Sequence, residues 1–569
     1  PVQLTQGDKN QVFVNGDMGF NARWPNTATG KFYEGFAEVE SGSNTTITDP
    51  KLAEFGDDFF KGATVWVNAG SRWTSQTSEV TDHSGDTITF NGLGLTDVQN
   101  TPAKGNPYYL FNVYGALDSE NEWWYDEEEQ MLYLYGDPTG KTVQVKARDT
   151  AINLDNVSYV NIDGIQVLGA GISGTNTSSI TLNRVEANYA AHASTIENPY
   201  GTDVASIKLF GNNNTISNCE VAYSSATGVW ISGDDNLLFN SKIHDTDYIG
   251  SYGACINVSG SGNVVSHNTA YNTGRDIIIF QSGDNCKIEY NDFSHSGMIC
   301  ADLGVFYTVA TDGGGTEICY NWVHDNDSSG SRSGIYLDNG TSNWLVHHNV
   351  VWDAGTALQL NVPSNYIAAY NNTFIGNINQ DFAWVFKTDT WGDRIINNIA
   401  TGNIALKDET LARTNFGNIA DPGFENADEH QYSLLANSQA IDAAEVIPGI
   451  NDDYVGIAPD LGAYEYGQEP WTAGCNLESP PEMPQMPVEL SAPRYSNLVE
   501  NAGFETRGLE GWTVSGPVSK ATPGAGHDPI QMDNGYTRTG YGSAKLTGSD
   551  AAVVAEPLDE DFSSGDLSA

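Results

Sequence analysis

The stretch Tyr320-Asn321-Trp322-Val323 returns as His348-Asn349-Val350-Val351, and this repetition decides the fold. An asparagine in the same short apolar phrase recurs through the middle of the chain, at intervals of 22 to 35 residues. Brief alternating segments such as Gly334-Ile335-Tyr336-Leu337-Asp338 lie between the copies. A repeat of this length with short strands and no helical period indicates a solenoid. The recurring asparagines are Asn183, Asn218, Asn240, Asn268, Asn291, Asn321, Asn349, Asn372 and Asn398.

The uneven spacing favours one kind of solenoid, the right-handed parallel β-helix. Leucine-rich and propeller repeats hold their length more tightly, whereas a β-helix tolerates loops of any size at its corners. We expect the asparagines to stack at one corner and to bond to each other up the column, which satisfies polar groups that would otherwise be buried alone. The alternative is that they are turns of an ordinary β-sandwich.

The rest of the chain differs in composition from the repeats. Strand-like segments such as Thr87-Ile88-Thr89-Phe90 with Gly and Asn turns predict a small antiparallel β-domain before the solenoid. We expect it to cover the open edge at the start of the solenoid. The predicted divisions are an N-terminal β-domain at 1–148, the β-helix with a closing coil at 149–468, a Pro-rich linker at 469–495 and a partial jelly-roll-like tail at 496–569.

The charge of the chain limits the kinds of partner that it can bind. The 569 residues include 73 Asp plus Glu against 25 Lys plus Arg, a net charge of -48. Such acidity argues against nucleic acid and membrane surfaces as partners, and no run of 18 apolar residues predicts a membrane span. High acid with scarce lysine indicates a marine or halophilic source, or simply an acidic surface. Because the chain starts at Pro1 without Met or a signal peptide, we expect a processed or trimmed form.

Cysteine and metal signals are weak. Six Cys occur without a CxxC pair, so no zinc or redox motif is predicted, and five of them adjoin apolar residues where thiols simply pack. One or two disulfides are an open alternative. The cluster Asp325-Asn326-Asp327 lacks an EF-hand pattern. We expect no required cofactor and no metal ligand, with a structural Ca²⁺ as the alternative.

The interior of a β-helix is packed, so we expect its site on an outer face. If Ile335 and Leu337 point inward, the period of two turns Tyr336 and Asp338 outward. Gln359 and Asn361 follow on the next coil.

Three aspartates, Asp276, Asp302 and Asp338, fall on consecutive predicted coils on or near that face. Coils stack about 4.8 Å apart, which would separate carboxylates one coil apart by about 5 Å and two coils apart by about 10 Å. These values bracket the separations used in retaining and inverting glycoside hydrolysis. One carboxyl gives a proton to the departing sugar oxygen, and the other attacks the sugar or activates water. The alternative for any single Asp is a solvated loop residue.

Further polar and aromatic residues border the predicted acid pair. His324 would orient an acid or bond a sugar hydroxyl, or alternatively only make a turn hydrogen bond with Asp325. The remaining substrate-binding candidates are Arg275, His295, Tyr307, Asp325, Tyr336, Gln359, Asn361 and Lys387.

The stretch 291–376 resembles secreted right-handed β-helix glycoside hydrolases of the β-xylosidase and fucosidase type. The resemblance is carried by Asp302-Leu303-Gly304-Val305-Phe306-Tyr307, Tyr320-Asn321-Trp322-Val323-His324-Asp325, Gly334-Ile335-Tyr336-Leu337-Asp338-Asn339 and Asn371-Asn372-Thr373. With the similar N-terminal Gln11-Val12-Phe13-Val14-Asn15-Gly16, it covers roughly residues 10 to 466. It implies a secreted, extracellular or periplasmic enzyme, a monomer or small homo-oligomer, that acts on a polysaccharide or oligosaccharide through an acidic pair. Asp302 and Asp338 match that pair best, with Asp276 and His324 as further catalytic candidates.

Two other functions are consistent with the fold. A polysaccharide lyase or uronan epimerase needs a base together with a cation to neutralise the uronate. The repeats hold few cations, Arg275 and Lys387 among them, and the Asp-Pro-His motif of uronan epimerases is absent. The second alternative is a glycan-binding protein without catalysis. A neutral glycan suits the charge of the chain, while a sulfated galactan would be reachable in salt.

Overall fold

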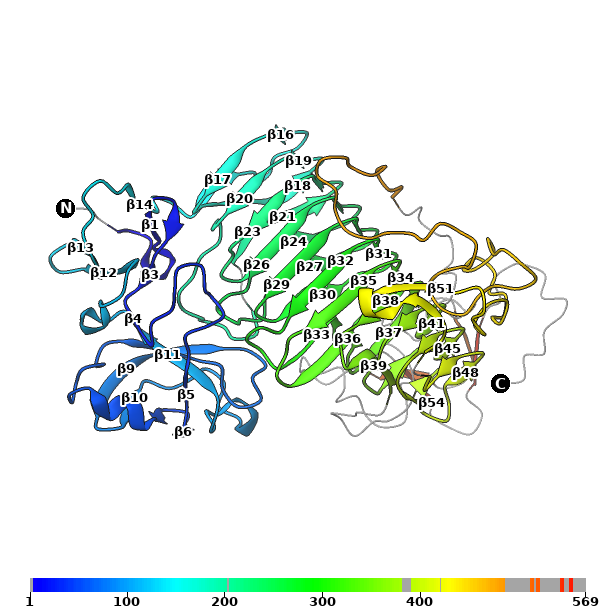
Figure 1. Cartoon of the computed structure of the whole chain (residues 1–569), viewed down its shortest axis with the longest axis horizontal. Coiled ribbons are helices and arrows are strands. Elements are labelled where there is room, and N and C mark those ends of the chain that lie inside the picture. The colour runs from blue at the N-terminus through cyan, green and yellow to red at the C-terminus, as the bar shows by residue number, and fades with distance from the viewer. Residues whose placement is uncertain are drawn as a thin grey trace.

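The computed structural model describes residues 4–201, 204–380, 390–419 and 421–486, together with four strands of the tail. The described chain is all-β and joins a parallel β-solenoid to antiparallel sheets at its N-terminal end, so the predicted fold class is confirmed (Figure 1). No described helix is long and apolar enough to cross a membrane. The short 3-10 helices are η1 (Gly7–Lys9), η2 (Pro50–Glu54), η3 (Val98–Asn100), η4 (Tyr114–Ala116) and η5 (Ala427–Glu429).

Three parallel sheets run the length of the solenoid, and each coil contributes one strand to each sheet, apart from β40 and β44, which are additional strands of sheet 2. Sheet 1 contains β15 (Thr150–Asn153), β18 (Gly171–Ser178), β21 (Ala205–Asn212), β24 (Thr227–Ser232), β27 (Ala254–Ser259), β30 (Asp276–Ser282), β33 (Asp302–Thr308), β36 (Ser331–Leu337), β39 (Thr356–Leu360), β43 (Asn377–Asn379) and β47 (Ile404–Ala405). Sheet 2 contains β16 (Asn161–Asp163), β19 (Thr181–Asn183), β22 (Thr215–Ser217), β25 (Leu237–Phe239), β28 (Val264–Ser266), β31 (Lys287–Glu289), β34 (Asp312–Cys319), β37 (Thr341–His347), β40 (Ser364–Asn365), β41 (Ala368–Tyr370), β44 (Thr390–Trp391), β45 (Arg394–Ile396) and β48 (Leu411–Arg413). Sheet 3 contains β17 (Gln166–Leu168), β20 (Glu186–Asn188), β23 (Glu220–Ala222), β26 (Lys242–Thr246), β29 (Thr269–Thr273), β32 (Asp292–Ser296), β35 (Trp322–Asn326), β38 (Val350–Trp352), β42 (Thr373–Phe374), β46 (Ile399–Ala400) and β49 (Phe416–Gly417).

The solenoid is filled by one continuous apolar core. Inward positions of all three sheets supply it, for example Ile335, Ile318 and Val323 from a single region of the stack. Because successive residues of a strand alternate between faces, the residues between them point outward. The interior therefore offers no cavity for chemistry, and any site lies on an outer face.

The asparagine ladder lies at the corner between sheets 2 and 3. Buried amides from Asn268 to Asn415 bond in sequence, each donating its Nδ2 to the Oδ1 of the next coil at 2.9 to 3.0 Å. In the earlier coils the ladder position belongs to Ser241 and Cys219 instead. Asn218 and Asn240 stand one residue earlier, in left-handed conformation, and form an outer column with Asn183. The predicted stacking is thus confirmed for the later coils, while the first three asparagines were assigned to the wrong column.

The N-terminal region forms three antiparallel or mixed sheets. They contain β1 (Val12–Val14), β2 (Asp17–Met18) and β14 (Val143–Val145); β3 (Phe20–Asn21), β12 (Glu122–Asp126) and β13 (Met131–Leu134); and β4 (Arg23–Trp24), β5 (Ala37–Glu38), β6 (Ser41–Ser43), β7 (Thr46–Thr48), β8 (Thr64–Val67), β9 (Gln76–Ser84), β10 (Thr87–Phe90) and β11 (Pro107–Phe111).

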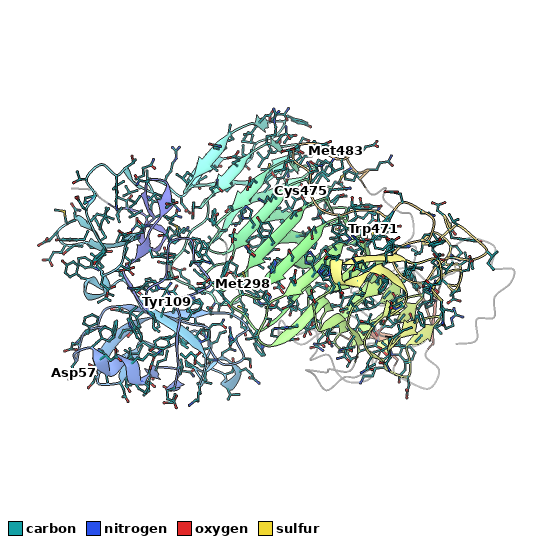
Figure 2. All side chains as sticks on the ribbon, in the orientation of Figure 1. Asp57, Tyr109, Met298, Trp471, Cys475 and Met483 are labelled. Atoms are coloured by element: carbon teal, nitrogen blue, oxygen red, sulfur yellow. The ribbon has the colours of Figure 1, made fainter. Side chains whose placement is uncertain are left out.

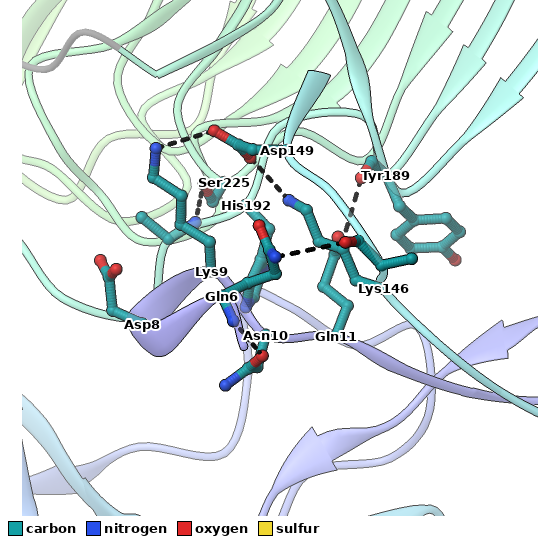
Figure 3. Close-up of polar contacts among 12 residues, drawn as sticks. Gln6, Asp8, Lys9, Asn10, Gln11, Lys146, Asp149, Tyr189, His192 and Ser225 are labelled. Carbon is teal, nitrogen blue, oxygen red and sulfur yellow. Dashed lines mark hydrogen bonds and ion pairs between the residues drawn. The ribbon is translucent and has the colours of Figure 1, made fainter. Parts of the chain in front are cut away.

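This region packs along the side of the solenoid rather than pairing with its first strands. Trp66 donates its indole N–H to the Ile249 carbonyl at 2.8 Å, and Arg72 bonds to Ser329 several coils further on. Lys9 and Lys146 both bond to Asp149 at 2.8 Å where the two parts meet (Figure 3). No described N-terminal strand pairs with β15, β16 or β17, so this region does not extend the open edge of the solenoid by strand pairing. It instead covers the corner that joins sheet 3 to sheet 1.

The chain after the last coil folds back over the solenoid. The hairpin of β50 (Phe424–Asn426) and β51 (Gln431–Leu434) precedes a segment that runs back across the coils, with Trp471, Cys475 and Met483 in order along it (Figures 1 and 2). Cys475 accordingly bonds to Thr269 of β29, far back in the sequence. In the tail, β52 (Trp512–Ser515) pairs with β55 (Ala552–Ala555) and β53 (Val518–Ala521) with β54 (Ser543–Leu546), while most of the predicted jelly-roll-like region lies outside the described residues.

Candidate functional site

A cluster of polar and aromatic side chains lies on the outer face of sheet 1, where β30, β33, β36 and β39 run side by side. The register aligns Tyr307 with Tyr336 and Tyr336 with Gln359, so these residues form one outward column. Ile335 and Leu337 lie in the core, as predicted.

Asp338 is the centre of a hydrogen-bond network on this face. Its Oδ2 accepts from the Tyr307 hydroxyl at 2.9 Å, and its Oδ1 accepts from Asn361 Nδ2 at 2.7 Å. The same Asn361 amide donates to the Tyr336 hydroxyl at 2.7 Å, and its Oδ1 accepts from Gln359 at 2.8 Å. Neutral donors thus bond both carboxylate oxygens and hold the group in one orientation while leaving it partly exposed.

Beneath this network lies a buried ion pair of consecutive residues, Arg275 and Asp276, with 2% and 0% of their side chains exposed. The Arg275 guanidinium also donates to the carbonyl oxygens of Trp73 and Asp302, at 3.1 and 3.2 Å. It stacks over the rings of Tyr252 and Tyr307 at 3.8 and 4.8 Å. Burial raises the pKa of Asp276 to about 7, although the Arg275 charge opposes the shift.

Asp302 is the second partly exposed carboxyl of the cluster. Burial raises its pKa, the Arg275 charge lowers it, and the charge of Asp338 raises it further. The two aspartates are therefore close enough to interact electrostatically.

The register corrects the expected geometry of this pair. Asp302 lies opposite Ser331, seven residues before Asp338, so the two do not occupy equivalent positions on stacked coils. The chain bends sharply after Asp302, since a Cβ at Gly304 would lie 2.3 Å from the Phe306 carbonyl oxygen. Coil stacking alone therefore does not determine the separation of these carboxyls.

His324, His295 and Asp325 form a separate group on sheet 3 and its following corner. His324 bonds through Nε2 to Asp292 at 2.8 Å and through Nδ1 to Asp325 at 2.7 Å, and its ring stacks on Trp352. Burial lowers the pKa of His324, but the hydrogen bonds to the two aspartates outweigh it and raise the pKa. His295 bonds to Asp327 at 2.9 Å. The His324–Asp325 contact is the turn hydrogen bond named above as the alternative.

The structure thus brings together eight of the twelve predicted site residues. The set comprises Arg275, Asp276, Asp302, Tyr307, Tyr336, Asp338, Gln359 and Asn361. Lys387 lies outside the described residues.

Two residues near the cluster were not predicted. Trp73 reaches it from the N-terminal region, 202 residues from Arg275 in sequence. No sequence pattern links positions so far apart in different folding units. Asp247 is fully buried beside Ser251, which bonds one of its oxygens, while the other oxygen has no partner. Burial raises the pKa of Asp247 well above its usual range, the Ser251 bonds lower it, and the charge of Arg275 also reaches it. This carboxyl is therefore part of the buried electrostatic support of the cluster.

Comparisons with known proteins agree with this fold. Residues 205–374 match a family model described as "Right handed beta helix region". Among solved structures, a chain described as a glycoside hydrolase is 13% identical with a TM-score of 0.43, covering 66% of this chain and 77% of that one. Pectate lyase Pel9A is 16% identical with a TM-score of 0.42, covering 56% and 89%. The mannuronan C-5 epimerase AlgE6 A-module of Azotobacter vinelandii is 12% identical with a TM-score of 0.26, covering 46% and 75%.

The fold and the family match define a right-handed parallel β-helix protein, as predicted. A search of curated protein sequences finds no significant match.

Proposed function

We propose that this protein is a glycoside hydrolase that cleaves a polysaccharide or its oligosaccharides on the outer face of sheet 1. The observation that carries the proposal is the pair of partly exposed, electrostatically coupled carboxyls of Asp302 and Asp338 among sugar-compatible tyrosine and amide groups. Glycoside hydrolysis requires two carboxyl groups in different protonation states at one place.

The environments of the two carboxyls support different roles. Asp302 has a raised pKa, which suits a general acid that protonates the departing sugar oxygen. Asp338 accepts hydrogen bonds on both oxygens, which suits a carboxylate that attacks the anomeric carbon or activates water. When Asp338 is ionised, its negative charge favours the protonated form of Asp302.

Neighbouring groups would bind and orient the sugar. Hydroxyl and amide groups of Tyr307, Tyr336, Gln359 and Asn361 form one connected network that can exchange hydrogen bonds with sugar hydroxyls. Arg275 acts as a positioning residue, because its stacking on Tyr307 and its bond to the Asp302 carbonyl connect the two sides of the pair.

The contacts of Arg275 argue against a lyase or epimerase at this site. A uronate substrate needs a cation to neutralise its carboxylate, but Arg275 is buried and already bonds to Asp276, Trp73 and Asp302. A hydrolase needs no such cation. The occupied contacts of Arg275 support our preference for hydrolysis over β-elimination.

The test is incubation of the purified chain with a panel of algal and plant polysaccharides, followed by reducing-end release and by the ultraviolet absorbance of unsaturated uronates. Reducing ends without that absorbance are the expected result. Asp302→Asn and Asp338→Asn should each lower the rate by about 10² to 10⁴-fold. Asp82→Asn, an exposed carboxyl of the N-terminal region, is the matched control and should leave the rate unchanged.

Two outcomes would reject this proposal. A rise in absorbance would mean β-elimination, the chemistry of the alternative enzyme class. Binding of a glycan that neither yields products nor changes in either variant would mean a glycan-binding protein without catalysis.

A further inference from the structure

The outer face of sheet 2 carries a cluster of metal-binding side-chain types, far from the network of Asp302 and Asp338 in the coil cross-section. The register places Cys319 of β34 between Glu289 of β31 and His347 of β37. Ile318 and Val346, which immediately precede Cys319 and His347 in their strands, lie in the core. Glu317, two residues before Cys319, belongs to the same outward face.

Three of these side chains converge. The candidate ligand atoms of Glu317, Cys319 and His347 all lie within 4.8 Å of one another, and His347 Nε2 is 3.8 Å from a Glu317 carboxylate oxygen. Cys319 is fully buried, and His347 is 6% exposed. A carboxylate, a thiolate and an imidazole are the three ligand types of zinc sites, whereas Ca²⁺ and Mg²⁺ select oxygen alone.

His348, the neighbour of His347, can determine which ring nitrogen of His347 is free to bind a metal. The Nδ1 atom of His347 lies 2.9 Å from Nδ1 of the half-buried His348, so one of the two nitrogens carries a proton and donates it to the other in a hydrogen bond. With the proton on His347 Nδ1, the lone pair of Nε2 faces Glu317. A hydrogen bond at one imidazole nitrogen that orients the other is the usual support of a metal-bound histidine.

A cation also lies on this face next to the cluster, because the register pairs Lys287 with Glu317. Lys287 forms an ion pair with Glu289 at 2.8 Å. Its ammonium charge opposes a bound metal, while Glu289 supplies a second carboxyl, beside Cys319 in the column.

We propose that Glu317, Cys319 and His347 bind one thiophilic divalent cation, of which Zn²⁺ is the representative. A water molecule or Glu289 would complete a tetrahedral shell. Binding replaces the thiol proton: the S–H bond breaks, a sulfur–metal bond forms and one proton is released to solvent. The ion would connect β34 and β37 on consecutive coils. The sequence does not predict this site, because its ligands come from two strands 28 residues apart and form no CxxC motif.

The test uses the full chain, stripped with a chelator and titrated with Co²⁺ as a spectroscopic probe for Zn²⁺. We expect one equivalent to bind with a thiolate-to-cobalt charge-transfer band, and excess Zn²⁺ to remove the band. Cys319→Ser should abolish it, and His347→Gln should weaken binding about tenfold or more. Cys255→Ser, another buried thiol of the solenoid, is the matched control and should retain the band.

Two further variants keep the proposal testable if Cys319→Ser does not fold. Glu317→Gln changes a partly exposed side chain and should weaken Co²⁺ binding while the sulfur band remains. Lys287→Met removes the opposing charge and should tighten binding severalfold. A wild-type chain without the band, a band that survives Cys319→Ser, or weaker binding after Lys287→Met would overturn the proposal.

Discussion

At the scale of single residues, Asp393 is a buried carboxyl bonded only by neutral donors, the Ile367 N–H and the side chains of Ser364 and Gln380. Burial raises its pKa from 3.8 to about 7. Between these values the folded chain holds a proton that the unfolded chain has lost. We therefore expect the free energy of unfolding to have its full contribution from Asp393 below pH 4. This contribution is lost as the pH rises towards 7, and the loss is at most about 4 kcal/mol.

Asp393→Asn isolates this contribution, because the amide stays neutral at every pH. Urea unfolding at pH 5 and pH 8 should give a smaller difference in unfolding free energy for Asp393→Asn than for the wild type. Asp428→Asn, an exposed residue, should retain the wild-type difference. Equal pH dependence in all three proteins would show that Asp393 titrates normally.

The alternation of side chains along a β-strand explains which site residues can be predicted from the sequence. Alternation along β36 predicts that Tyr336 and Asp338 face outward together, and parallel stacking adds Gln359 from the next coil. The position of Asp302 relative to Asp338 was not predictable, because it depends on the bend at Gly304. His324 lies near Asp338 in sequence but on another face, because consecutive strands of a coil belong to different sheets.

At the scale of elements, the asparagine ladder is the corner that holds sheets 2 and 3 together. Asn321 donates to the Asn349 amide and to the carbonyls of Ile288 and Cys319, and accepts from Asn291. Asn321→Ala would leave several buried polar groups without partners, at about 1–3 kcal/mol each. We expect it to destabilise the chain by at least about 3 kcal/mol, measured by urea unfolding.

The control for the ladder is Asn183→Ala in the outer column, where the side chain is half-exposed. Water can replace its partners, so the loss should stay below about 1 kcal/mol. Similar losses in both variants would contradict a special role for the buried column. The sequence predicts that the ladder exists, but it does not show which column the first three asparagines join. In those coils Ser241 and Cys219 occupy the ladder position, and a pattern of asparagines alone does not include them.

At the scale of the whole molecule, the net charge of -48 means that most surface carboxylates repel one another. Folding concentrates this charge, so repulsion destabilises the compact state. Raising NaCl from about 0.1 to 1 M shortens the Debye length from about 10 to 3 Å. We therefore expect the melting temperature to rise by several degrees, with most of the rise at low salt and a plateau above, because screening saturates.

The shape of the salt curve separates screening from general salt effects on the hydrophobic core. Salt that is excluded from the apolar surface strengthens burial in proportion to the salt concentration. This effect depends on the anion and is stronger for sulfate than for chloride. Screening depends on ionic strength alone, so NaCl and Na₂SO₄ at equal ionic strength should give one curve. A linear rise without a plateau, or no rise, would mean that repulsion among the surface carboxylates does not limit the stability of the fold. The same measurement bears on substrate choice, since the salt that stabilises the chain also permits approach of an anionic glycan to its acidic surface.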